Sequence, residues 1–172
     1  ARSFDDIDKA CMLVKFGAEK RDINIRPEDK VRTAWHESGH AIARHYLCPG
    51  QTIDTISIIP TEEGALGFVA TNHDEDRHSY SRSEILNELI VCLAGREAEQ
   101  MAPGLDAAEG VNSGASSDLK QATRLAYISI TEFGLDKKFG PVSIAALPEG
   151  IINSDLGETI HERIRKLLEE AK

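Results

Sequence analysis

The stretch from Pro27 to Leu47 constrains the fold most, because it can form one long helix with no interruption. Proline suits the first position of a helix, and the two acidic residues after Pro27 favour the positive end of the helix dipole. Pro49 and Gly50 end the pattern. The motif HESGH, residues 36–40, therefore falls in the interior of a predicted helix.

The spacing of HESGH is typical of a catalytic metal site. His36 and His40 lie on one face of the helix, with Cβ atoms about 5–6 Å apart. Two imidazoles so placed can bind one zinc ion with Zn–N bonds of about 2.0–2.1 Å. Glu37 is rotated by about 100° and stands beside the metal, where it can take a proton from a zinc-activated water. The interior Gly39 costs about 0.5–1 kcal/mol relative to alanine, so we expect another element or the substrate to pack against it.

The residues alone leave the third metal ligand open. Ala43 and Tyr46 stand where a metzincin would have glycine and histidine, which excludes that class. Asp118 is a candidate because it falls in the first turn of a predicted helix that follows a loop of small residues, although a helix-dipole role is also open to it. Glutamates of another predicted helix would give a thermolysin-like set: Glu84, Glu88, Glu97 and Glu99.

The rest of the chain predicts an α+β domain that is mainly α-helical. Helical periodicity continues from residue 4 to Gly17, and Ser81 with Glu84 forms a capping box before a helix that reaches residue 101. Two more helices are expected over residues 117–133 and from Ser154 onward. Residues 53–60 and 66–71 are rich in β-branched side chains and predict a small hairpin or sheet. The zinc-binding HExxH helix should pack with these helices and this sheet.

Charge and cysteine content exclude several classes of protein. Twenty basic and 29 acidic side chains give a formal charge of −9, so neither nucleic acid nor an anionic membrane surface is an expected partner. Three widely spaced cysteines without a CxxC pair exclude a disulfide framework and favour a reducing compartment. The apolar runs are too short to span a bilayer, so this chain alone is expected to be soluble.

The order of motifs resembles the peptidase domain of the FtsH-type ATP-dependent zinc metalloprotease family. The matching segments are HESGHAI, ISIIP followed by ALGFV, LAGREAEQM, and NSGASSDLKQATRLAYISITEFGLDKKFGPV. Residues 1–24 resemble the end of the family's ATPase lid with its linker, and residues 25–172 resemble the zinc metallopeptidase domain. One departure is Asn112-Ser113, where the family commonly has two threonines.

The resemblance implies a site and a biological role. It implies His36, His40 and Asp118 as ligands of one zinc ion per chain, with Glu37 as the catalytic residue. It also implies an endopeptidase that degrades unfolded or misassembled proteins, works as a homo-hexamer and is driven by an ATPase. This chain has no phosphate-binding GxxxxGK[ST] loop, so ATP would act through a module outside it. Family members are usually membrane-anchored, with the peptidase facing cytoplasm, matrix or stroma.

Two questions of function stay open at this point. The strand TISIIP, residues 55–60, is either an open edge that an extended substrate joins as a further strand or a simply packed strand, and the resemblance favours the first. The alternative function is a zinc-containing scaffold that binds proteins without cutting them. Glu37 argues against the scaffold, because a structural zinc site needs no base and normally has four protein ligands.

Overall fold

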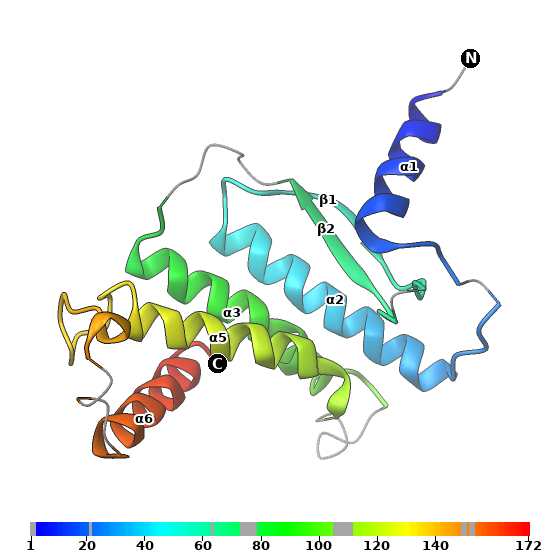
Figure 1. Ribbon diagram of the computed structural model, residues 1–172. Coiled ribbons are helices and arrows are strands. Elements are labelled where there is room, and N and C mark those ends of the chain that lie inside the picture. Colours follow the sequence, from blue (N-terminus) through cyan, green and yellow to red (C-terminus); the bar gives the residue numbers. More distant parts are fainter. Residues whose placement is uncertain are drawn as a thin grey trace.

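The computed structural model describes residues 3–20, 22–62, 64–72, 79–104, 112–148, 151 and 154–172. Within them, five α-helices and a two-stranded sheet confirm the mainly helical α+β class (Figure 1). The elements are α1 (Phe4–Phe16), α2 (Pro27–Leu47), β1 (Thr52–Ser57), β2 (Phe68–Asn72), α3 (Arg82–Glu99), the 3₁₀ helix η1 (Ser113–Ala115), α5 (Ser116–Thr131), the 3₁₀ helix η2 (Ile144–Ala146) and α6 (Ser154–Glu170). None of the helices in these ranges is long and apolar enough to cross a membrane.

Local signals in the sequence set the helix ends. Pro27 occupies the first turn of α2, with Glu28 and Asp29 beside it, and the helix contains the whole HESGH motif as predicted. The predicted capping box at the start of α3 is present, because Ser81 and Glu84 bond each other's backbone N–H. α1 ends at Phe16 and is capped by Gly17, which has a positive φ of 77° that favours glycine.

α3 is the central helix, lying between α2 and α5 (Figure 1). Gly39 allows α2 to approach α3 closely, because a Cβ at this position would overlap the carbonyl oxygen of Ala94 and the methyl group of Ala98. The expectation that another element packs against Gly39 is therefore confirmed, and that element is α3. α3 also packs against α5, where it meets Ala122 and Ala126.

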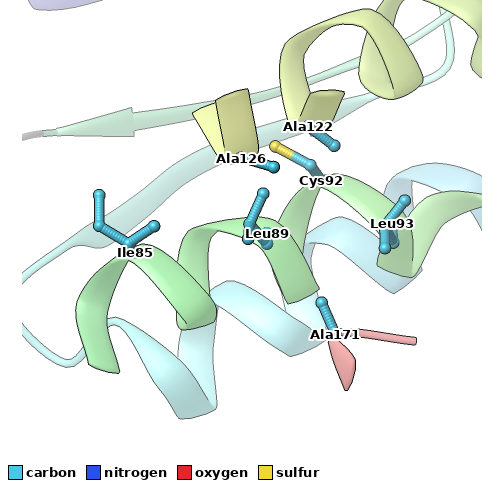
Figure 2. Packing of buried hydrophobic residues seen from close by; sticks show 7 residues of the cluster. All are labelled: Ile85, Leu89, Cys92, Leu93, Ala122, Ala126 and Ala171. Carbon is cyan, nitrogen blue, oxygen red and sulfur yellow. The ribbon is translucent and has the colours of Figure 1, made fainter. Parts of the chain in front are cut away.

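The hydrophobic core lies between α3, α5 and the end of the chain (Figure 2). Leu89 of α3 is fully buried, and Ala122 and Ala126 of α5 face it one helical turn apart. Two alanines four residues apart put little side-chain bulk on this face of α5, which lets α5 approach α3 and places Asp118 near α2. The other buried members of the cluster are Ile85, Cys92, Leu93 and Ala171.

The sheet lies across α2, and the chain that follows α1 joins it (Figure 1). β1 and β2 are antiparallel, with an irregularity in the register between Ile53 and Thr55. Beyond β1, the backbone of Lys20 donates to Pro60 and that of Glu62 donates to Ala18. The rings of Phe16 and Phe68 stack with centroids 4.0 Å apart, so the end of α1 is attached to the start of β2.

Candidate metal centre

Two histidines of α2 point their Nε2 atoms at the same place. Helical spacing brings the Nε2 atoms of His36 and His40 to 2.9 Å from each other. Their rings meet edge to face, with centroids 4.6 Å apart. The two nitrogens therefore converge on a shared position.

A carboxylate from α5 completes the group. Oδ2 of Asp118, in the first turn of α5, lies 3.1 Å from Nε2 of His36 and 3.6 Å from Nε2 of His40. Within the described part of the chain, these three residues form the one cluster of histidine, cysteine and carboxylate groups whose ligand atoms all lie within 4.8 Å of one another. The structure thus brings together the three residues that the resemblance implied.

The other ring nitrogen of each histidine is bound by α3. Nδ1 of His36 lies 2.6 Å from Oε1 of Glu99, and Nδ1 of His40 lies 2.7 Å from the backbone oxygen of Val91. Both partners accept a hydrogen bond, so each Nδ1 carries a proton and each Nε2 is the nitrogen that faces the metal position. This arrangement is the usual one behind histidines that bind metal.

None of the four glutamates weighed as a third ligand belongs to the cluster of His36, His40 and Asp118. Glu99 contacts the Nδ1 side of His36, away from the converging Nε2 atoms. Glu97 accepts a hydrogen bond from Gln100 and pairs with Lys172 at 3.6 Å. Both residues are on α3, but neither carboxylate joins Asp118 in the cluster.

The dimensions and donors of the cluster fit a zinc ion. Donors around a tetrahedral ion with bonds of about 2.0–2.1 Å are about 3.3 Å apart, and the separations here bracket that value. Gly95 of α3 forms the wall behind the rings, where a Cβ would come within 2.5 Å of Nε2 of His40. Two nitrogens and one carboxylate oxygen are a donor set that zinc accepts, with one position left for solvent or substrate.

The electrostatics of the cluster favour a cation at its centre. Burial opposes a charge on His36, but hydrogen bonds with Asp118 and Glu99 outweigh it and raise the pKa of His36 to about 10. Burial also opposes the charge on Asp118, yet the two histidines hold the pKa of this carboxyl well below its ordinary range. A divalent metal would displace the proton from His36 and occupy the same favourable field.

Glu37 is buried beside the ligands. Its side chain is 7% exposed, and its Cγ lies against Gly67, where no Cβ would fit. Burial raises the pKa of Glu37, while electrostatic interactions with His36 and His40 oppose the rise. A carboxyl with a raised pKa accepts a proton more readily than an ordinary carboxyl.

Asn112 is a residue of the site that the motif analysis did not identify. It caps η1 by accepting a hydrogen bond from the backbone N–H of Gly114, and its amide nitrogen donates to Glu99 at 2.6 Å. An asparagine two residues before a glycine is a signal for such a cap. The contact with Glu99 joins residues distant in sequence and has no local signal.

Comparison with known proteins agrees with this geometry. The model of peptidase family M41 matches residues 23–172. The ATP-dependent zinc metalloprotease FtsH of Thermus thermophilus is 34% identical and covers 96% of this chain, which spans 27% of that protein. The protein of that name from Aquifex aeolicus is 30% identical over 98% of the chain and 27% of its own length. FTSH 11, chloroplastic/mitochondrial, of Arabidopsis thaliana is 36% identical over 98% of the chain and 20% of its own length.

The chain therefore spans about a quarter of the length of these relatives. The family model covers most of the chain, including α2 with both histidines and α5 with Asp118. Together with the converging ligand atoms, this match assigns the chain to a protease family: it belongs to peptidase family M41.

Proposed function

We propose that this chain is a zinc-dependent endopeptidase module in which His36, His40 and Asp118 bind the metal and Glu37 is the general base. The observation that carries the proposal is the convergence of three ligand atoms, from α2 and α5, beside a buried glutamate. The relatives are named zinc metalloproteases, which supports zinc over other divalent ions. Three protein ligands rather than four indicate a catalytic site.

The proposed chemistry divides between the metal and the protein. Zinc, when bound, supplies a Lewis acid that polarises a carbonyl and lowers the pKa of a coordinated water to about 7. Glu37 accepts the proton of the attacking water and returns it to the leaving amine. Glu99 and the carbonyl of Val91 hold the imidazoles with Nε2 directed at the metal position.

The proposed substrates are unfolded or misassembled proteins in extended form. β1 and β2 form a sheet of two strands in the described residues, so each strand has an edge that no further strand covers. An extended chain that joins the edge of β1 would bind through backbone hydrogen bonds without a sequence preference. Cutting within such a chain makes the enzyme an endopeptidase.

We also propose coupling to an ATPase module in a homo-hexamer. The relatives are named ATP-dependent and are about four times as long as this chain, which supports a module outside residues 1–172. Residues 1–24 are proposed as the end of the ATPase lid and its linker, and residues 25–172 as the peptidase domain. This assembly gives the enzyme its supply of unfolded chain.

The proposal is tested by measuring zinc content and degradation of fluorescein-labelled casein for three variants. Glu37→Gln should retain zinc and lose activity, whereas Asp118→Ala should lose both. Glu97→Gln is the matched control on α3, because its carboxylate pairs with Lys172, and it should retain both. Activity that survives in Glu37→Gln would refute Glu37 as the general base, and a wild-type chain that binds zinc without cutting casein would favour the non-cutting scaffold. Zinc that survives in Asp118→Ala would refute Asp118 as a ligand.

A further inference from the structure

The side chain of Asn112 forms hydrogen bonds with two segments beside the candidate metal centre. One carries Glu99, which contacts His36, and the other leads into α5, which carries Asp118. Its Nδ2 donates to Oε2 of Glu99 at 2.6 Å, and its Oδ1 accepts from the backbone N–H of Gly114 at 2.5 Å. Glu99 belongs to the last turn of α3, whereas Gly114 belongs to η1. A single amide group therefore joins the end of one helix to the beginning of another.

The bond to Glu99 acts on the orientation of His36. The side chain of Glu99 is 4% exposed, and its Oε1 bonds to Nδ1 of His36. A buried carboxylate needs partners for both oxygens, because an unsatisfied charged oxygen is costly away from water. Asn112 provides a partner for Oε2 and so fixes the rotation of the carboxylate that aligns the His36 ring.

The bond to Gly114 acts on the position of Asp118. η1 continues into α5 without a break, and Asp118 lies in the first turn of α5. Ala115, between the cap and this turn, is 1% exposed, so the segment is packed as well as capped. A shift at Gly114 would therefore move the first turn of α5 and the carboxylate it carries.

We infer that Asn112 is a positioning residue, which sets the spacing between His36 and Asp118 and so the affinity of the site for zinc. The inference rests on the proposed function of the cluster as a zinc site. An amide suits this task because it offers a donor on one side and an acceptor on the other. Serine at this position keeps an oxygen that can cap η1 but lacks the amide nitrogen that donates to Glu99. Asn112→Ser therefore removes the bond to Glu99 and keeps the bond to Gly114.

The test is the zinc affinity of the purified chain, measured by competition with a chromophoric chelator. Asn112→Ser should weaken zinc binding by about tenfold or more, the effect typical of losing a residue that orients a metal ligand. Asn87→Ser is the matched control. The amide of Asn87 in α3 donates a hydrogen bond to the backbone oxygen of Leu47 in α2, so it also joins two helices, but its bond is not to a residue of the site. This control should bind zinc as tightly as the wild type.

A double-mutant cycle distinguishes positioning from general loosening. If Asn112 acts through Glu99, Asn112→Ser should cost less zinc affinity in a Glu99→Ala background than in the wild type. Equal losses in the two backgrounds would overturn the inference. The visible spectrum of bound Co²⁺ gives a second readout that needs no activity: Asn112→Ser should change its intensity relative to the wild type, and an unchanged spectrum with unchanged zinc affinity would also overturn it.

The outcomes separate this inference from the proposed function. A wild-type chain that binds no stoichiometric zinc would refute the metal centre and the inference with it. If the wild type binds zinc and the zinc affinity of Asn112→Ser is within twofold of the wild-type value, the positioning role is refuted and the metal centre stands. Far-UV circular dichroism of each variant establishes that it is folded, and Asn112→Asp, which keeps an isosteric cap, replaces the serine variant should that one be unfolded.

Discussion

Gly95 of α3 lies directly against the imidazole of His40, where a Cβ would come within 2.5 Å of Nε2. The same Cβ would lie 2.8 Å from Nε2 of His36. The missing side chain thus leaves room for both rings at the candidate metal centre. The close contact of α3 with α2 at Gly39 fixes this wall in place.

Gly95→Ala should therefore displace the rings and weaken zinc binding by at least about tenfold. Gly157→Ala is the matched control, because this glycine lies in α6 and a Cβ there meets nothing within 4 Å. The control should bind zinc normally and gain about 0.5–1 kcal/mol of stability. Chelator competition and denaturant unfolding measure both effects, and wild-type zinc affinity in Gly95→Ala would contradict the placement of the rings.

The pairing of Asp136 with Arg163 should make stability depend on pH. Oδ2 of Asp136 accepts hydrogen bonds from Nε and Nη2 of Arg163 at 3.0 and 2.7 Å, and Oδ1 accepts from two backbone N–H groups. Burial opposes the charge, but these bonds outweigh it and lower the pKa of Asp136. The contribution of the Asp136 carboxylate to the free energy of unfolding is therefore fully present above its unfolded pKa of about 4. This contribution is lost as the pH falls through the lower pKa of the folded state.

Asp136→Asn should accordingly lower the free energy of unfolding by about 2–4 kcal/mol at pH 7. The difference in free energy of unfolding between the wild type and Asp136→Asn should become smaller as the pH falls below about 4. Urea unfolding at several pH values measures this difference. Glu162→Gln is the control, because Glu162 pairs with Lys166 on the exposed face of α6, the helix that carries Arg163. This variant should change the free energy of unfolding little. A difference that stays constant with pH would rule out the charge as the cause.

Local signals predicted the helices well, whereas the site needed contacts that the sequence does not encode locally. Pro27 and the capping box at Ser81 fix helix ends through the residues next to them. The pair His36 and His40 follows from helical spacing. Asp118 could not be separated from Glu97 and Glu99 by physical argument, because its place depends on how α5 packs on α3. Only tertiary structure reveals which oxygen faces which ring nitrogen.

The stack of Phe16 on Phe68 should control how firmly the segment after α1 is attached to the sheet. Phe16→Ala removes a stacked pair worth about 0.5–1.5 kcal/mol beyond its buried area. Hydrogen exchange at the amides of Lys20 and Glu62, which bond across this junction, should become about two- to tenfold faster. Phe4→Ala is the control, since Phe4 is 87% exposed on the same helix. Equal exchange in both variants would show that the stack contributes nothing to the attachment.

Ile58→Pro should reduce cleavage of unfolded protein while leaving zinc bound. Ile58 follows β1 directly and is 40% exposed, at the end of the strand that the substrate is proposed to join. Proline removes the backbone N–H, so a bound chain would lose a hydrogen bond that strand addition requires. Ile58→Ala is the control, because it removes the side chain and keeps the N–H. If both variants lose activity equally, the side chain of Ile58 is what binds substrate, and if Ile58→Pro cleaves casein at the wild-type rate, substrate does not pair with this edge.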